Sequence, residues 1–313
     1  MIPTFRAASS ILNVLQNVPP EIDSIFVIDD ACPNHTGRLV EKECFDPRVT
    51  VIYHGQNQGV GGAVITGYRE AFMRGADIVV KVDSDGQMDP KLIPQLTLPL
   101  ISGIADYAKG NRFHNPDDVR KMPLPRLIGN LGLSFLTKFS TGYWGVFDPT
   151  NGFTALHRTA YNMLPQDKIS KRYFFETDML FRLHIIRAVV ADMPMKAVYA
   201  EEESNLSISH SLFEFAGRHV ITFCKRIAYE YFLRDFTPGS FNLVAGIIFV
   251  FSSIAFGVSK WAESITTGTP ATAGTVVLSA MLFVFGVQLI QGFMHQDYGS
   301  VPKISLQQLM NHD

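Results

Sequence analysis

Two long stretches without a charged residue near the C-terminus constrain the fold more than any other feature. The first runs from Phe236 to Ser259, 24 residues without Asp, Glu, Lys or Arg, and the second from Ser264 to Gln296. A helix of about 20 apolar residues crosses the hydrocarbon core of a bilayer. Buried core helices are the alternative, but helices that are apolar on every side rarely fit inside a small domain. We therefore expect a two-helix transmembrane hairpin within residues 236–296.

The distribution of basic residues predicts the orientation of this hairpin. Four basic residues lie between positions 218 and 234, whereas the loop between the runs offers Lys260 and the tail Lys303. By the positive-inside rule, residues 1–212 and the tail 297–313 face the cytoplasm, at the inner membrane if the source is a bacterium. Residues 213–235 alternate apolar and basic side chains at helical spacing. They predict a juxtamembrane amphipathic helix, either in the membrane interface or packed on the globular part.

Composition excludes several classes of protein. The net charge is −2 and only 18% of the residues are charged, so no polybasic surface for nucleic acid is expected. The three cysteines, Cys32, Cys44 and Cys224, have neither zinc-site spacing nor the even count of a disulfide framework.

The N-terminal part alternates short β-branched runs with helical segments. Residues 25–28, 49–53 and 78–82 read as strands, and residues 34–42 and 62–74 as helices. Such alternation predicts an α/β fold with a mostly parallel sheet covered by helices. The chain opens at Ile2-Pro3, so the first strand is expected to be very short. Ligands of such sheets bind at the carboxyl ends of the strands.

The most specific motif is Asp83-Ser84-Asp85-Gly86-Gln87, directly after the third strand. In an extended chain, alternate side chains point to the same side, so Asp83, Asp85 and Gln87 would present three oxygen donors together. Carboxylate and amide oxygens suit Mg²⁺ or Mn²⁺, with positions left for a diphosphate. A solvated acidic turn is the alternative.

Four further groups are candidates for binding residues. Asn57–Ala63 is a glycine-rich helix start that either binds phosphate or packs closely on its neighbours. Asp29-Asp30 either contacts a nucleotide or caps a turn. Lys109–Arg112 and Arg126 offer cations for phosphate or are surface arginines. Glu176–Asp178 offers a base or a hydroxyl contact, or is an acidic helix start.

In this order the motifs resemble family 2 glycosyltransferases, specifically those that glycosylate a polyprenyl phosphate, such as dolichyl-phosphate mannose synthases and undecaprenyl-phosphate glucosyltransferases. The resemblance extends from Pro3 to about Arg234, and the C-terminal spans match the layout of bacterial members. Asp148–Phe153 resembles the family's Asp-x-x-x-Gly-Phe turn. At the start, Phe5, Arg6 and Ala7 replace the usual Tyr, Asn and Glu.

The resemblance implies a GT-A fold and inverting transfer of one sugar from a UDP- or GDP-sugar to a polyprenyl phosphate. It implies Asp85, Arg112 and Arg126 as catalytic residues, and Asp83, Asp85 and Gln87 as ligands of Mg²⁺ or Mn²⁺. The implied acceptor-phosphate residues are Arg112, Arg126 and Asn130, and the candidate sugar contacts are Glu176 and Asp178. The implied nucleotide-binding residues are Pro3, Phe5, Asp29, Asp30, Asn57, Gly59, Ala63, Asp83 and Ser84.

Two alternatives remain open. A processive membrane polysaccharide synthase would make a polymer, although such enzymes usually have more spans and a Gln-x-x-Arg-Trp segment. A catalytically degenerate membrane module would bind a nucleotide sugar without turnover. The small residues of the spans permit a homo-oligomer.

Overall fold

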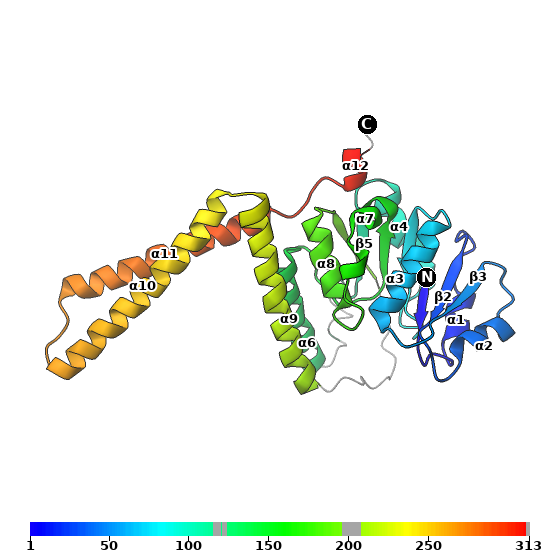
Figure 1. Ribbon diagram of the computed structural model, residues 1–313, viewed down its shortest axis with the longest axis horizontal. Coiled ribbons are helices and arrows are strands. Elements are labelled where there is room, and N and C mark those ends of the chain that lie inside the picture. Colours follow the sequence, from blue (N-terminus) through cyan, green and yellow to red (C-terminus); the bar gives the residue numbers. More distant parts are fainter. Residues whose placement is uncertain (115–119, 121–123, 196–207, 311–313) are drawn as a thin grey trace. The chain divides into compact units, whose positions relative to one another are not determined.

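The computed structural model describes residues 1–114, 120, 124–195 and 208–310, and within it the chain divides into two compact units. The first unit holds residues 1–223 and 302–313, and the second holds residues 224–301. Figure 1 shows strands flanked by helices in the first unit and a helical hairpin in the second. The expected α/β fold, followed by two apolar helices, is confirmed.

The first sheet is parallel, with strand order β1-β2-β3 among the described residues. Its strands are β1 (Ile2–Thr4), β2 (Ile25–Asp29) and β3 (Val49–Tyr53). Ile2 pairs with Val27, so β1 contacts only the later part of β2. The expected short first strand is confirmed, because β1 comprises only three residues.

The second sheet is mixed, with described strand order β4-β6-β5-β7. Its strands are β4 (Ile78–Lys81), β5 (Tyr107–Asn111), β6 (Thr154–His157) and β7 (Val190–Pro194). Strand β6 runs antiparallel to β4 and β5, whereas β5 and β7 are parallel. The backbone of Met1 forms hydrogen bonds with β4 and with the residue that follows it. The Met1 amine donates to Val80 O at 2.6 Å, and the Met1 carbonyl accepts from Val82 N. Met1 thus joins the two sheets.

Helices cover the sheets and bury one apolar core. Val14, Val27, Leu96 and Ala108 belong to the same buried cluster, which links α1 and α4 to both sheets. Most of the remaining helices of the first unit lie between strands in chain order, whereas α12 follows the helical hairpin of the second unit. The helices of this unit are α1 (Ile11–Gln16), α2 (Thr36–Glu43), α3 (Val60–Met73), η1 (Pro90–Leu92), α4 (Ile93–Ile101), α6 (Leu124–Thr141), α7 (Arg158–Met163), η2 (Gln166–Lys168), α8 (Phe175–Ile185), α12 (Leu306–Met310) and most of α9 (Ile208–Ala228).

Helix α9 packs on α6 through an aromatic and polar contact. Phe139 and Phe223 stack with ring centroids 4.4 Å apart, and the Nδ1 atom of buried His219 lies 2.8 Å from Ser140 Oγ. Burial lowers the pKa of His219 to about 4, since the charged imidazolium would lose its hydration. His219 therefore packs between the helices as a neutral ring at neutral pH.

This burial predicts acid sensitivity of the α6–α9 contact. Between pH 6.5 and about 4 the unfolded chain protonates His219 and the folded chain does not, so stability falls as the pH decreases through this window. We expect a loss of up to ~3 kcal/mol in wild type and a smaller loss in His219→Gln. Thermal unfolding of both proteins in detergent across pH 4–7 measures this loss of stability. If the stability of the two proteins fell equally with decreasing pH, His219 would not be the cause of the acid sensitivity.

The segment after the hairpin returns to the first unit. The buried carboxylate of Asp106 accepts hydrogen bonds from the amides of Val189, Leu306 and Gln307, at 2.8, 2.9 and 3.3 Å. Ser305 Oγ also donates to Gly103 O at 2.5 Å. Asp106 thereby caps α12 and binds the tail next to β5. Of the expected tail 297–313, the part from Pro302 onward belongs to the first unit, and residues 297–301 belong to the second.

The second unit consists of a π-helical turn, η3 (Tyr229–Arg234), and the hairpin helices α10 (Pro238–Thr267) and α11 (Ala273–Gly299). The two long helices approach closely at glycines: a Cβ at Gly246 would lie 3.0 Å from Gly286 O, and one at Gly286 would lie 2.9 Å from Val250 N. Ser253 Oγ donates to Ser279 O at 2.8 Å in the same contact.

Helices α10 and α11 leave most of their apolar surface uncovered. In their most hydrophobic 18-residue windows only 11% and 6% of the residues are buried within the described chain. Phe251 and Ile248, for example, are 68% and 54% exposed. Core helices of a water-soluble domain bury such side chains, so this exposure favours lipid as their surroundings.

A buried ion-pair cluster connects the two ends of this unit. The guanidinium of Arg226, fully buried, contacts both carboxylate oxygens of Asp297 at 2.6 and 3.1 Å and Glu230 Oε2 at 3.3 Å. The hydroxyl of Tyr231 donates to Asp297 Oδ1 at 2.8 Å. The cluster therefore holds the end of α11 against the segment that precedes α10.

Candidate active site

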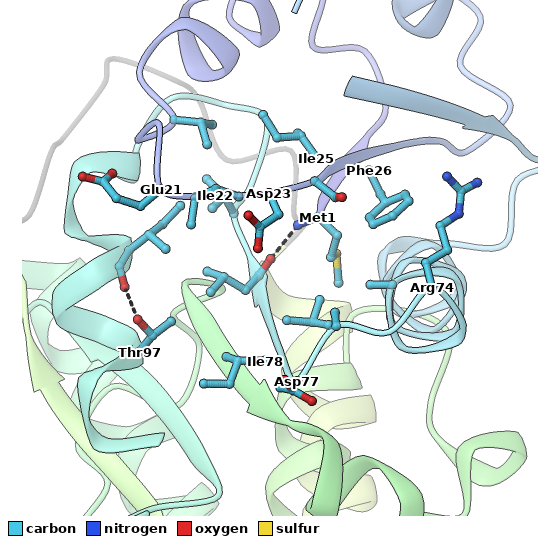
Figure 2. Close-up of a pocket in the computed structure, with 18 of the residues that line it drawn as sticks. Met1, Glu21, Ile22, Asp23, Ile25, Phe26, Arg74, Asp77, Ile78 and Thr97 are labelled. Atoms are coloured by element: carbon cyan, nitrogen blue, oxygen red, sulfur yellow. Dashed lines mark hydrogen bonds between the residues drawn. The ribbon is translucent and has the colours of Figure 1, made fainter. Parts of the chain in front are cut away.

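Several of the sequence-derived site residues lie at the carboxyl ends of strands in the first unit. Asp29-Asp30 end β2, Asp83–Gln87 follow β4, and Arg112 follows β5. A cavity of about 610 Å³ lies at the opposite ends of β2 and β4, lined by residues such as Ile25 and Ile78 and shown in Figure 2. Because ligands of α/β sheets bind at the carboxyl ends, this cavity is not the candidate donor site.

Asp29 and Asp30 organise the loops around the end of β2. Asp29 accepts hydrogen bonds from the amides of Cys32 and Gly37, both at 2.7 Å. Asp30 accepts from the amides of Gln58 and Gly59, both at 2.8 Å. Each carboxylate is buried. The geometry thus matches the turn-capping alternative, and Asp30 ties the glycine-rich loop to β2.

The glycine-rich loop packs closely on another backbone segment. Gly59 has φ +85° and precedes α3, and a Cβ there would lie 2.6 Å from Lys171 O. A Cβ at Gly61 would collide with Ser170 O and lie 2.9 Å from the Phe175 ring. Gly62 N donates to Lys171 O at 3.1 Å. Close packing explains these glycines without a phosphate.

This packing predicts a large difference between two glycine substitutions. Gly61→Ala is expected to cost ~1–3 kcal/mol, because a methyl group has no space against the Ser170 carbonyl. Gly55→Ala, in a nearby loop with no atom within 4 Å of the place its methyl group would take, is the matched control and should change stability little. Melting temperatures of both variants measure the difference. Equal melting temperatures would contradict the packing.

The Asp83–Gln87 loop keeps its polar side chains partly accessible. Asp83, Asp85 and Gln87 are each half-buried, whereas Ser84 is buried and its carbonyl accepts from Ser10 Oγ at 2.6 Å. Asp85 Oδ1 accepts from Gln87 N at 2.9 Å. No group of three His, Cys, Asp or Glu side chains that could hold a metal ion occurs among the described residues.

The first aspartate of this loop is paired with a buried lysine. Lys81 Nζ lies 2.7 Å from Asp83 Oδ1 and 3.5 Å from Glu176 Oε1, on α8. Lys81 is 1% exposed. Burial lowers the pKa of Lys81, but the carboxylates of Asp83 and Glu176 outweigh this effect and raise it above its usual value. The ammonium therefore stays charged and brings Asp83 and Glu176 together.

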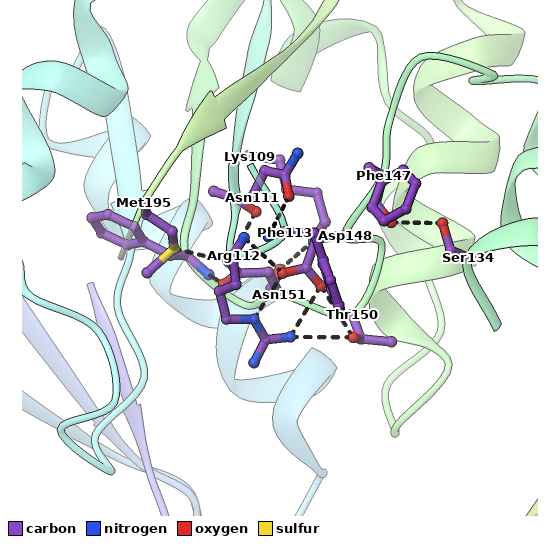
Figure 3. A network of polar contacts seen from close by, with 12 residues as sticks. Lys109, Asn111, Arg112, Phe113, Ser134, Phe147, Asp148, Thr150, Asn151 and Met195 are labelled. Atoms are coloured by element: carbon purple, nitrogen blue, oxygen red, sulfur yellow. Dashed lines mark hydrogen bonds and ion pairs between the residues drawn. The ribbon is translucent and has the colours of Figure 1, made fainter. Parts of the chain in front are cut away.

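Arg112 forms a bidentate ion pair with the turn that follows α6. Its Nε lies 2.7 Å from Asp148 Oδ2 and its Nη2 3.0 Å from Asp148 Oδ1, as Figure 3 shows. The carboxylate of Asp148 also accepts from the Arg112 amide at 3.2 Å. This arrangement fixes the plane of the guanidinium.

A second buried lysine holds the same turn. Lys109 Nζ donates to Asn151 O, and Asn151 Nδ2 donates in turn to Gly110 O at 2.9 Å (Figure 3). Burial lowers the pKa of Lys109 to about 8. The sequence motifs had not singled out Lys81, and they had named Lys109 only as the first residue of the cationic segment Lys109–Arg112. Their signal is a lysine within a strand whose other side chains are largely buried.

The remaining site residues divide between the site and other contacts. Glu176 faces Lys81, but Asp178 accepts from Ser170 N at 2.8 Å and pairs with Arg182 at 2.9 Å. Asp178 is thus engaged within its own helix and the preceding loop. Phe5 directly follows β1 and is 45% exposed, and Ala63 is buried in α3.

Two predicted acceptor residues lie on α6. Asn130 is half-buried in the middle of this helix. Arg126 lies in its first turn, and its side chain falls outside the described residues. Their roles stay predictions.

Comparison with known proteins identifies the family. Residues 1–164 match the model of glycosyl transferase family 2. A UDP-N-acetylglucosamine–dolichyl-phosphate N-acetylglucosaminyltransferase from Methanococcus voltae is 33% identical over 215 residues, which are 64% of this chain and 85% of the relative. An undecaprenyl-phosphate mannosyltransferase from Micrococcus luteus is 30% identical over 213 residues, 66% of this chain and 86% of the relative.

Solved structures show the same fold at low sequence identity. Mannosyl-3-phosphoglycerate synthase from Rubrobacter xylanophilus has a TM-score of 0.53 at 16% identity, covering 75% of each chain. Glucosyl-3-phosphoglycerate synthase from Mycobacterium tuberculosis, solved with Mn²⁺, UDP and glucosyl-3-phosphoglycerate, has a TM-score of 0.50 at 18% identity, covering 72% of this chain and 77% of the neighbour. The resemblance inferred from the motifs is therefore confirmed, and this chain belongs to glycosyltransferase family 2, with a GT-A fold in its first unit.

Proposed function

We propose that this glycosyltransferase transfers one sugar, with inversion, from a UDP- or GDP-sugar to a polyprenyl phosphate at a membrane surface. The observation that carries the proposal is that one chain joins a GT-A unit, charged at the carboxyl edge of its sheet, to the exposed apolar helices α10 and α11. The two relatives support the acceptor class, because both are named for a polyprenyl phosphate.

The oxygen ligands near Asp85 fit a divalent cation that is bound by the protein and by a substrate phosphate together. Asp85 and Gln87 offer a carboxylate and an amide oxygen, helped by Asp83, and Mg²⁺ in proteins is often bound by one or two carboxylates plus substrate phosphates. The lack of a cage of three acidic groups among the described residues agrees with that mode. The Mycobacterium tuberculosis neighbour was solved with Mn²⁺ and UDP. When bound, such an ion neutralises charge on the departing nucleoside diphosphate.

The acceptor chemistry explains why arginines, rather than a strong base, would carry the reaction. A phosphate monoester has a second pKa near 6 and is already ionised at neutral pH. Its oxygen forms the new bond to the anomeric carbon while the bond to the diphosphate breaks, so no proton must be removed. Arg112, oriented by Asp148, together with Arg126 and Asn130, would hold this phosphate close to the anionic donor.

An apolar surface on α6 supports an approach from the lipid. Leu124, Ile128, Leu131 and Phe135 recur at spacings of four, three and four residues and are 44–66% exposed. This spacing places them on one face of the helix. Arg126 and Asn130 lie on the same helix, so the proposed phosphate contacts would be near a lipid-facing surface.

The connection of the units supports a hairpin with both ends on one side of the membrane. Phe223 and Pro302 belong to the first unit, and residues 224–301 lie between them. If α10 and α11 both span the bilayer, the loop around Thr269 lies on the opposite side. The basic residues that precede α10 favour the cytoplasm for the first unit.

Thiol labelling tests this topology. In intact cells a membrane-impermeant maleimide should label Thr269→Cys and leave the wild type, whose cysteines are at 32, 44 and 224, unlabelled. Labelling of the wild type, or of Thr269→Cys only after permeabilisation, would contradict the proposed orientation.

Metal removal tests the chemistry. Purified protein in detergent with undecaprenyl phosphate and a nucleotide sugar should form glycolipid with Mg²⁺ or Mn²⁺. Transfer should stop in EDTA and recover when the ion is restored. An equal rate of sugar transfer in EDTA and with the ion would contradict a role for the divalent cation.

A further inference from the structure

The ammonium of Lys81 occupies the position between two acidic side chains of the candidate site. It lies 2.7 Å from Asp83 Oδ1 and 3.5 Å from Glu176 Oε1. The Asp83 and Glu176 side chains are 27% and 17% exposed, whereas that of Lys81 is 1% exposed. The two carboxylates therefore face the site, and the charge that compensates them lies beneath it.

The surroundings hold this ammonium in place. A Cβ at Gly152 would collide with both Lys81 Nζ and Asp83 Oδ2, so the Asp148–Phe153 turn packs directly on the pair. Lys81 is also the last residue of β4, whose backbone pairs with β6 through Thr154. The backbone at Lys81 is therefore held by strand pairing, and the turn lies directly against the ammonium.

We propose that Lys81 is a positioning residue that compensates the charge of Asp83 and thereby makes binding of the divalent ion depend on the donor diphosphate. This inference rests on the proposed function. A divalent cation at Asp83 would be repelled by an ammonium 2.7 Å from the same carboxylate. The ion without nucleotide is therefore bound weakly by Asp85 and Gln87, and the diphosphate supplies the missing negative charge.

Binding of Mn²⁺ alone, followed by electron paramagnetic resonance on the full chain in detergent, tests this inference. Lys81→Met removes the ammonium and leaves two carboxylates facing one position. We expect its Mn²⁺ affinity without nucleotide to rise by at least about tenfold. A purely structural role of Lys81 would only weaken binding. Lys91→Met, which removes the same charge from an exposed residue of η1, is the matched control and should leave the affinity unchanged.

A double variant identifies the carboxylate that is responsible. In Lys81→Met/Asp83→Asn the gain in affinity should disappear, because Asp83 can no longer attract the ion. A gain that persists in the double variant, or no gain in Lys81→Met, would overturn the inference while leaving the proposed function intact. Absence of Mn²⁺ binding in all variants, with and without UDP, would overturn both.

A comparison that keeps Lys81 covers the case in which its substitution prevents folding. With Lys81 present, Asp83→Asn should weaken the affinity for Mn²⁺ alone less than Asp85→Asn does, because Asp83 is paired with the ammonium whereas Asp85 is the carboxylate that this inference assigns to the ion. Asp85→Asn should weaken it by about tenfold or more. Equal losses in the two variants would show that Asp83 binds the ion directly and would overturn the inference.

Discussion

Asp85→Asn is expected to lower sugar transfer by roughly 10³-fold while leaving the fold intact. The asparagine keeps an oxygen that can accept the hydrogen bond from Gln87 N, so the loop conformation should survive. It loses the negative charge that we assign to holding the ion on the donor diphosphate. Initial rates of glycolipid formation at saturating Mn²⁺ and the melting temperature measure the two effects separately.

A matched substitution in the same loop controls for this prediction. Asp89→Asn also converts an acid to an amide, but Asp89 is exposed and only accepts from Lys91 N at 3.0 Å at the start of η1. Its transfer rate should stay near that of the wild type. Near-normal rates for Asp85→Asn would show that the site assignment is wrong.

The largest expected loss of stability comes from Asp297→Asn, in the second unit. The substitution leaves Arg226 fully buried with its principal counter-charge removed, and breaking one partner of a buried pair costs ~3–5 kcal/mol. The asparagine keeps an oxygen that can accept the hydrogen bond from the Tyr231 hydroxyl. The expected loss of stability therefore comes mainly from the lost negative charge. The readout is the unfolding transition of the full chain in detergent.

Glu263→Gln is the control, since it breaks a pair of similar length that is exposed. Lys260 Nζ lies 2.7 Å from Glu263 Oε2, with side chains 43% and 58% exposed, and exposed pairs contribute ~0–1 kcal/mol. A shift in the unfolding transition for Asp297→Asn no larger than that for Glu263→Gln would contradict a stabilising role for the buried cluster.

The main elements of the fold could be predicted because their signals are local. The runs at residues 25–28 and 49–53 are β-branched and end at turn residues, and they form β2 and β3. The uncharged runs at the C-terminus form most of α10 and α11, although α10 continues through Lys260 and Glu263 and α11 includes Asp297. By contrast β5 contains Lys109, Gly110 and Asn111, which weaken the pattern of a strand, and it was not predicted as one.

The candidate site could be located from sequence, but its internal partners could not. The Asp83–Gln87 motif follows β4, so it places the candidate site at the carboxyl edge of the sheet. The contact of Lys81 with Glu176 depends on the approach of α8, because Glu176 lies 95 residues after Lys81 in the chain. Asp30 and Asp178 have the residue type of ligand contacts, yet their carboxylates bind backbone amides of neighbouring loops. Residue type alone does not distinguish these two uses of an acid.

The tail illustrates the same limit. Nothing in Ser305 or Leu306 indicates a partner, and Asp106 lies 200 residues earlier than Leu306. The contact forms because a buried carboxylate at the start of β5 needs donors, and the first turn of a helix supplies unpaired amides. Such a partnership depends on the tertiary fold.

The most direct test of the account is the mass of the lipid formed from undecaprenyl phosphate when the purified protein is offered a panel of UDP- and GDP-sugars with Mn²⁺. The account predicts one nucleotide sugar that yields a product heavier by a single sugar residue, and no such product from Asp85→Asn. A ladder of products with many sugars would favour a processive synthase. Nucleotide binding without any lipid product from the whole panel would contradict transfer to a polyprenyl phosphate.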